Sequence, residues 1–155
     1  MSEACEVRPA RLADADVVAR LLHGLWPEGT VAEHRAEVVS ILSGAPPSAL
    51  PLVVFLAEAA GQVVGVIEVG LRSHADGCDG RHPVGFVEGW YVEPEHRGKD
   101  VGRALMLAAE GWARLQGCRE LASDTWIDNE PSQRAHEALG FEVVDRCVHF
   151  KKSLA

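Results

Sequence analysis

Residues 96–106 read HRGKDVGRALM, a polar loop that contains glycine and leads directly into a helical pattern. Before it, residues 85–92 (GFVEGWYV) have the β-branched and aromatic composition of a strand. After it, apolar residues recur at helical spacing up to a stop signal at Gly117. A strand, such a loop and a helix in this order turn main-chain N–H groups and the helix dipole toward an anion. The stretch therefore predicts an α/β unit with an anion-binding turn, although its spacing alone also fits an ordinary strand-to-helix loop.

The rest of the chain extends this unit into a single sheet covered by helices. A short extended start at residues 6–9 precedes an amphipathic helix that we expect Asp14 to cap and Pro27 to end. A second helix is predicted over residues 31–42, and residues 52–59 and 62–72 form a hairpin pattern. A long loop at 73–83, a short strand at 119–125, a helix at 132–139 and an extended element at 141–150 complete the expected order β-α-α-β-β-β-α-β-α-β. This order predicts an α/β (α+β) fold with a mixed sheet.

Composition limits the class of protein. A chain of 155 residues without an internal repeat or linker predicts one domain over residues 1–155. The formal net charge of -8 disfavours nucleic acid and anionic lipid as partners and permits a cationic substrate. We expect neither a membrane span nor a secretory leader, and hence a cytoplasmic protein. The scattered cysteines and histidines have no metal-ligand spacing, so we predict no metal and no disulfide framework.

Three residues stand out as candidates for chemistry. Glu88 is a carboxylate within an otherwise apolar strand, and it is costly to bury unless it has a partner or a task. Asp124 follows a short strand, at the end where α/β sheets bind ligands. Trp26 follows the first helix. Each has an ordinary alternative: a salt-bridged strand glutamate, a capping aspartate and a core tryptophan.

The whole chain resembles the GNAT superfamily of acyl-CoA-dependent N-acetyltransferases, whose pyrophosphate loop has the pattern Arg/Gln-x-x-Gly-x-Gly/Ala. This resemblance implies the GNAT fold, a twisted, mostly antiparallel mixed sheet with about four helices, and acetyl-CoA as cosubstrate. The cofactor-binding residues that it implies are Tyr91, Val92, Arg97, Gly98, Lys99, Asp100, Val101, Gly102, Arg103 and Asn129. Asp100 departs from the pattern, which has glycine there. We expect Asp100 to accept positive φ at some cost, to cap the helix and to point its charge away from the diphosphate.

Several motifs resemble more specifically the aminoglycoside 6′-N-acetyltransferases: LWP at 25–27, FVEGWYV at 86–92, GCRELASDT at 117–125 and NEPSQRAHEALGF at 129–141. The resemblance implies that Glu88 and Asp124 contact the substrate and accept its proton, directly or through water. It also implies that Trp26, His74, Asp79 and Asp145 contribute to the substrate site. Many superfamily members have a tyrosine where this chain has His136, so the general acid is either His136 or absent.

The resemblance implies direct attack of an amine on the acetyl thioester, with the 6′-amine of an aminoglycoside as acceptor and antibiotic resistance as the outcome. Two alternatives stay open. One is an N-acetyltransferase for another small amine, such as a polyamine or an amino sugar. The other is a non-catalytic acyl-CoA-binding module, which Asp100 and the missing tyrosine keep open. The resemblance also implies a homodimer, and the β-rich last segment is compatible with exchange of C-terminal strands.

Overall fold

The computed structural model describes residues 4–155, and the elements follow the expected order up to the last helix. The strands are β1 (Glu6–Pro9), β2 (Leu52–Ala59), β3 (Gln62–Arg72), β4 (Val84–Val92) and β5 (Leu121–Ser123). The helices are α1 (Ala15–Leu25), α2 (Val31–Leu42), α3 (Val101–Leu115) and α4 (Glu130–Ala138), with short 3-10 turns at Leu12–Asp14 and Pro94–His96. The described residues thus confirm the predicted mixed sheet with four helices.

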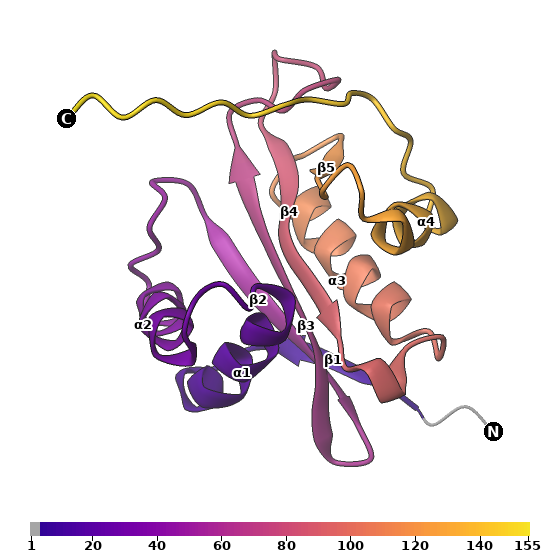
Figure 1. Cartoon of the computed structure of the whole chain (residues 1–155). Helices are drawn as coiled ribbons and strands as arrows, with labels where there is room; N and C mark the ends of the chain where they lie inside the picture. The colour runs from indigo at the N-terminus through magenta and orange to yellow at the C-terminus, as the bar shows by residue number, and fades with distance from the viewer. Residues whose placement is uncertain (1–3) are drawn as a thin grey trace.

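The described residues form one five-stranded sheet in the order β1-β2-β3-β4-β5. The first four strands pair antiparallel, and β5 pairs parallel with β4 through three residue pairs that end at Val87 and Ser123. Helices α1 and α2 lie on one side of the sheet, and α3 and α4 lie on the other (Figure 1).

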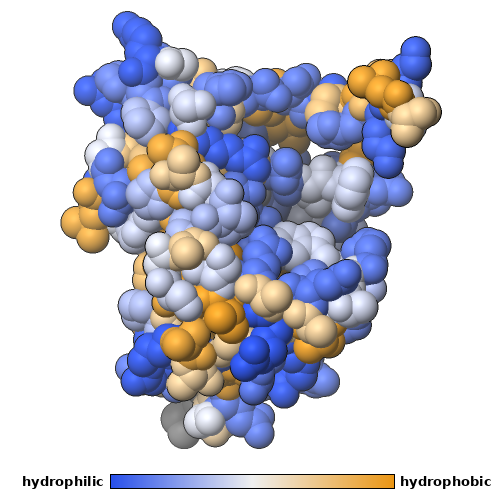
Figure 2. Space-filling view, turned by 90° about the vertical axis from the view of Figure 1, so that its left-hand side faces the viewer, coloured by the Kyte–Doolittle hydropathy of each residue, from blue (hydrophilic) through white to orange (hydrophobic). Residues whose placement is uncertain are grey.

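Two apolar clusters fix the helices to the sheet. On one face, Leu105 and Met106 of α3 pack among buried strand residues that include Ile67 and Val87. On the other face, α1 and α2 pack against buried residues that include Leu56. Each helix buries one stripe of side chains, as an amphipathic helix on a sheet must. The face shown in Figure 2 is mostly hydrophilic, with small separate hydrophobic patches.

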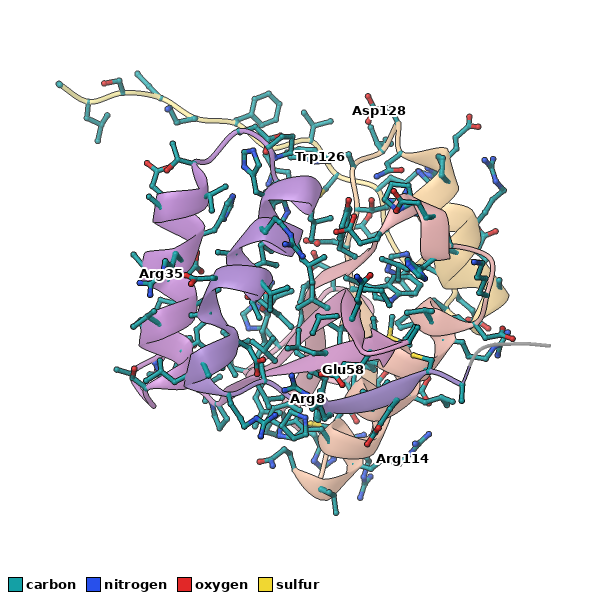
Figure 3. All side chains as sticks on the ribbon, turned by 90° about the horizontal axis from the view of Figure 1, so that it is seen from below. Arg8, Arg35, Glu58, Arg114, Trp126 and Asp128 are labelled. Atoms are coloured by element: carbon teal, nitrogen blue, oxygen red, sulfur yellow. The ribbon has the colours of Figure 1, made fainter. Side chains whose placement is uncertain are left out.

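Two details of the expected fold are wrong. Residues 141–155 belong to no strand, because they pair with no other strand among the described residues (Figure 1). Apart from the half-buried Phe141, their apolar side chains are exposed, up to 93% for Phe150. Asp14 precedes α1 but makes no side-chain bond that caps α1; at the preceding 3-10 turn its carboxylate accepts the amide of Arg11 at 2.7 Å. Its carboxylate instead binds Arg8, whose guanidinium also reaches Glu58, and Figure 3 shows Arg8 and Glu58 close together at the sheet.

Candidate functional site

The pairing of β4 with its two neighbours places Glu88 beside Asp124. On the β3 side, Glu68 lies opposite Gly89 and Val69 opposite Val87, so Glu88 is an extra residue in β4, a β-bulge. On the β5 side, the last parallel pair is Val87 with Ser123, and Glu88 and Asp124 follow it directly. Beyond this pair the main-chain groups of β4 are open on the β5 side among the described residues. The register thus brings together the two carboxylates that the sequence singled out.

Arg72, which the sequence analysis did not select, holds Glu88 in place. Its Nε donates to Oε1 of Glu88 at 2.9 Å and its Nη2 donates to Oε2 at 2.8 Å. The guanidinium carbon lies 3.4 Å from the centroid of the Phe86 ring. Hydrogen bonding to Glu88 is the main cause that raises the pKa of Arg72, and the charge of Asp124 adds to it. In residues 4–155 no side chain hydrogen-bonds to Asp124, so Asp124 is the exposed, freer carboxylate of this cluster.

Trp26 forms one wall of the same region and is held by the α2 layer. Gly89 lies so close to Trp26 that a Cβ at position 89 would be 2.8 Å from the Trp26 ring. The carbonyl oxygen of Trp26 accepts a hydrogen bond from Nε2 of His34 at 2.9 Å, and that of Gly29 accepts one from Nδ1 of His23 at 2.9 Å. A carbonyl oxygen only accepts, so each histidine carries its proton on the named nitrogen. The two histidines therefore fix the turn that carries Trp26.

The loop before α3 has the geometry of an anion cradle. Gly98 has φ 74° and Asp100 has φ 64°, both in the left-handed region. The first main-chain bond of α3 runs from Ala104 N to Asp100 O. Among residues 4–155, the amides from Gly98 to Arg103 donate to no carbonyl, so they remain available to an anion at the positive end of the helix dipole. The amide of Arg97, which we expected in the cradle, instead donates to Pro94 O.

Asp100 confirms one part of its expected behaviour and contradicts another. It does precede α3 with positive φ, but its side chain makes no capping hydrogen bond. Its carboxylate turns outward, is 83% exposed, and lies 3.6 Å from Nε of Arg103. The surface beside it is a cleft of about 190 Å³ lined by Trp90, Gly98, Asp100, Gly102, Arg103, Ala135 and Leu139. Four of these residues are among those expected to bind the cofactor.

The other residues expected to bind the cofactor, together with Trp90, hold the loop before α3 in place. Trp90 Nε1 donates to Gly102 O at 3.2 Å, which ties the start of α3 to β4. Arg97 Nε donates to Val92 O at 2.8 Å, and its guanidinium lies 5.3 Å from the Tyr91 ring. Lys99 is exposed in the loop, and Val101 is buried under it. Arg97 therefore holds the end of β4, while Lys99 offers an exposed positive charge near the cradle.

His136 is held at both ring nitrogens. Its Nδ1 donates to Ser132 O at 2.7 Å, and its Nε2 lies 2.8 Å from the hydroxyl of Ser123, the last residue of β5. Trp90 and Phe141 make edge contacts with the ring. Because Nδ1 carries the proton in the neutral ring, Nε2 accepts from Ser123. Asn129, which was expected to bind the cofactor, precedes α4 and caps it by accepting a hydrogen bond from Ser132 N.

Within the loop at residues 73–83, Asp79 lies away from the carboxylate pair. Its side chain is held by a bidentate bond from Arg81, and its amide donates to Glu120, which precedes β5. Asp124 follows the other end of β5, about 13 Å away along the strand. His74 is exposed. A Cβ at Gly77 would meet Val144 at 2.5 Å, so the C-terminal segment, which carries the exposed Asp145, crosses this loop.

Glu68 is a second group that the sequence analysis missed. It is 3% exposed, and among residues 4–155 its Oε1 has no hydrogen-bond partner. Burial, followed by the charges of Glu37 and Glu88, raises the pKa of Glu68 to about 7. Glu68 lies within the apolar run VVGVIEVGL at 63–71, so the criterion that selected Glu88 also applies to it. No such signal marked Arg72 in the sequence, because an arginine at the end of a strand is usually solvated.

Other features of the described residues carry no assigned chemistry. An open cleft of about 590 Å³ lies between α1 and the start of β3, and it is lined by Val17, Arg20, Gln62, Val63, Val64, Glu93, Glu95 and His96. Within residues 4–155, His, Cys, Asp and Glu form no group of three or more that could hold a metal ion. None of the helices in this part of the chain has the length and apolar character needed to cross a membrane.

Comparisons with known proteins agree with this geometry. The profile described as acetyltransferase (GNAT) family matches residues 18–141. Aminoglycoside N(6')-acetyltransferase type 1 of Stenotrophomonas maltophilia is 42% identical over 156 residues, which cover 99% of this chain and 97% of the relative. The protein of the same description from Klebsiella aerogenes is 42% identical over 149 residues, covering 96% of both chains.

Two solved structures are also similar. AAC(6')-Iy, in complex with the bisubstrate analog CoA-S-monomethyl-acetylneamine, has a TM-score of 0.86 and 33% identity, covering 97% of this chain and 99% of that one. AAC(6')-IG of Acinetobacter haemolyticus has a TM-score of 0.85 and 31% identity, with coverage of 97% and 99%. The similarity extends over nearly the whole length of each protein.

Proposed function

The chain belongs to the acetyltransferase (GNAT) family, and on that premise we propose that it transfers the acetyl group of acetyl-CoA to the 6′-amine of aminoglycosides. The observation that carries this proposal is the β4 register. It sets Glu88 and Asp124 side by side where β4 and β5 separate, on the same strand that leads into the anion cradle. A pair of carboxylates next to a diphosphate site suits a polycationic acceptor and an acyl-CoA donor. The acetylated antibiotic would no longer act as the free amine, which gives resistance.

The residues at the start of α3 fit the diphosphate of coenzyme A. The free amides from Gly98 to Arg103 and the helix dipole provide donors, and Lys99 provides positive charge. The open side of β4 beyond Val87 offers main-chain groups that an extended chain containing amides can pair with. We expect Asn129 and the main chain at Tyr91 and Val92 to contribute further contacts to the coenzyme. Bound acetyl-CoA supplies an acetyl group activated as a thioester.

The carboxylates recognise the acceptor and take its proton. An aminoglycoside carries several ammonium groups, and charge-assisted hydrogen bonds to Glu88 and Asp124 orient one of them. Glu88 is already fixed by Arg72, so it serves to position the amine. Asp124 is free to accept a proton, directly or through water. Trp26 provides a flat wall, and His74, Asp79 and Asp145 belong to an outer part of the site formed by the loop and the C-terminal segment.

His136 reaches the reaction only through Ser123. In its neutral form Nε2 has no proton to give, whereas the imidazolium donates to the Ser123 hydroxyl, which can pass a proton on. We therefore keep His136 as the candidate acid, with Ser123 as its relay. If His136→Phe retains kcat while lowering stability, the histidine is structural and the thiolate leaves without assistance.

The C-terminal segment supports a homodimer as part of the proposal. Residues 141–155 are extended and leave five large apolar side chains exposed: Val143, Val144, Val148, Phe150 and Leu154. A second copy of the chain can cover them by pairing this segment with its own sheet, which removes an unpaired edge. Sedimentation of the full chain should give a dimer, and Phe150→Asp together with Val148→Asp should give a monomer. A wild-type monomer at micromolar concentration would contradict the dimer.

We expect the enzyme in the cytoplasm, where acetyl-CoA is present.

A panel of amines tests the function. Thiol release from acetyl-CoA is measured with kanamycin, tobramycin and spermidine, and NMR of the product locates the new amide. We expect turnover of the two antibiotics with acetylation at the 6′ position. Turnover of spermidine alone would favour the small-amine alternative. Binding of acetyl-CoA without acetylation of any amine would favour the non-catalytic module.

Glu88→Gln and Asp124→Asn test the assignment of the carboxylates. Each variant keeps the shape of the side chain and removes its charge. A loss of about 10²-fold or more in kcat/KM is expected for Asp124→Asn if it accepts the proton. Unchanged turnover in both variants would remove both residues from the mechanism.

A further inference from the structure

The most unusual group outside the described chemistry is the carboxyl of Glu68. It lies in the middle of β3, opposite Val54 on one side and Gly89 on the other. It is 3% exposed, and Oε1 lacks a hydrogen-bond partner within residues 4–155. An unpartnered buried carboxyl costs stability, and a hydrophobic residue would fill the position at lower cost. Such a group is typically retained at a site where a ligand becomes its partner.

The surroundings of Glu68 are acidic and partly open to solvent. Glu37 of α2 and Glu88 of β4 are the charged groups that act on it. Glu37 is exposed, and the Glu88 side chain is partly exposed. Arg72, the nearest cation on the same strand, is already bound to Glu88. The two histidines of the overlying helices, His34 and His23, are bonded to the carbonyls of Trp26 and Gly29. Of their other charged groups, Arg35 pairs with Asp16, and Glu33 accepts a hydrogen bond from Thr30 N.

Resting on the proposed function, we propose that Glu68, Glu37 and Glu88 form a subsite for an ammonium group of the acceptor, in which Glu68 releases its proton to solvent as the cation binds. The three carboxylates come from three different elements, α2, β3 and β4. Together they can surround one bound cation. Trp26 on Gly89 closes the apolar side, so a cation there is shielded from water and its attraction to Glu68 is stronger.

Proton release follows from the change in surroundings. Without a cation, burial and two neighbouring negative charges keep the Glu68 carboxyl protonated near neutral pH. A bound ammonium reverses the local charge, so the carboxylate becomes the favoured form and accepts a charge-assisted hydrogen bond. Binding to this subsite therefore strengthens as pH rises through neutrality. The amine that is acetylated is a different one, held by Glu88 and Asp124 next to the cofactor route.

The test compares Glu68→Gln with the wild type, using kanamycin and saturating acetyl-CoA at pH 6 and pH 8. Glutamine matches the neutral carboxyl in shape and has no charge at either pH, so the fold is kept. At pH 8 we expect KM to rise about 10-fold in the variant, the loss of one charge-assisted hydrogen bond, while kcat changes less than about 3-fold. At pH 6 the two proteins should agree within about 2-fold, because Glu68 is then neutral in both.

The ratio of the two KM values at each pH cancels the titration of kanamycin itself, since both proteins bind the same substrate. Glu110→Gln on α3 is the matched control and should leave KM unchanged at both pH values. Calorimetry of kanamycin binding in two buffers of different ionisation enthalpy should show more proton release from the wild type than from Glu68→Gln. If the wild type acetylates kanamycin but the ratio of the KM of Glu68→Gln to that of the wild type is the same at pH 6 and pH 8, the subsite proposal alone is wrong. A wild type that neither binds nor acetylates kanamycin overturns the proposed function and the subsite with it.

Discussion

Arg72 and Glu88 form a two-point hydrogen-bonded pair, at 2.9 Å and 2.8 Å, across a β-bulge in the strand that faces Asp124. The pair fixes the direction of a carboxylate that would otherwise rotate in a half-open site. It also places a positive charge between the acidic groups of the site, which reduces their mutual repulsion. Arg72 is therefore a positioning residue for the acceptor amine, although it leaves the carboxylate oxygens able to accept further bonds.

The first prediction concerns this pair. Arg72→Gln should lower kcat/KM for kanamycin about 10-fold to 100-fold, because Glu88 loses its orientation. Arg72→Lys should recover only part of this, since an ammonium cannot make the forked contact. Steady-state kinetics and the KM for acetyl-CoA, which should not change, provide the measurement. The control is Arg35→Gln, which removes an exposed pair with Asp16. Equal activity of Arg72→Gln and wild type would exclude a positioning role.

The second prediction concerns Asp100, which stands at φ 64° beside the expected diphosphate. Asp100→Asn keeps tolerance of the left-handed backbone and removes the charge, whereas Asp100→Gly removes both charge and strain. Each should lower the Kd for acetyl-CoA about 3-fold to 10-fold at low salt by removing a like charge, with a smaller effect at high salt. Titration calorimetry at two salt concentrations measures it. Unchanged or weaker binding in both variants would mean that the outward Asp100 carboxylate does not oppose the diphosphate.

The third prediction concerns the cost of burying Glu68. The pKa of Glu68 is about 7 in the fold against an ordinary value of 4.5. Below pH 4.5 the carboxyl is protonated in both states and costs nothing. Stability is lost as pH rises through 7, because the unfolded state ionises first, and the full loss is about 3 kcal/mol. Glu68→Gln should therefore be more stable than wild type by about 3 kcal/mol at pH 8 and by almost nothing at pH 4. Urea unfolding across pH measures this, and a pH-independent difference would contradict it.

The fourth prediction concerns Asp14, whose carboxylate binds Arg8. Hydrogen bonding to Arg8 is the main cause that lowers the pKa of Asp14 to about 2 from an ordinary 3.8. The resulting stabilisation is present above pH 3.8 and is lost as pH falls through 2. Asp14→Asn should therefore lower the free energy of unfolding by about 2 kcal/mol at pH 7. The exposed Asp16→Asn serves as control and should have little effect. The same loss at pH 2 and pH 7 would show that packing, and not charge, is responsible.

Local sequence was sufficient for most elements. The helix at Val31–Leu42 has the predicted range, and α3 begins at Val101 as its apolar spacing predicts. The hairpin of β2 and β3 follows from two β-branched runs around one short turn. These features depend on neighbours a few residues apart, which a sequence displays directly. The motifs around the start of α3 and around Asp124 were also local, which is why the family could be recognised.

Other features depended on contacts between distant parts of the chain. The bulge at Glu88, the grip of Arg72 and the burial of Glu68 all arise from how β3, β4 and α2 meet. The side chain of Asp14 was expected to cap a helix and was taken by Arg8 instead. The last segment has the composition of a strand, yet residues 141–155 pair with no strand in the described part of one chain. A strand exists only when a neighbour supplies its hydrogen bonds.

By itself, then, the sequence determined the helices, the hairpin and the chemical character of a diphosphate loop beside acidic residues, because helical period, glycine and charge are properties of short segments. Only the tertiary structure decided which carboxylates meet, which one is neutralised by an arginine and which one is buried without a partner. Strand register and helix packing make those choices. A shift of one residue in register would turn Glu88 to the opposite face of the sheet.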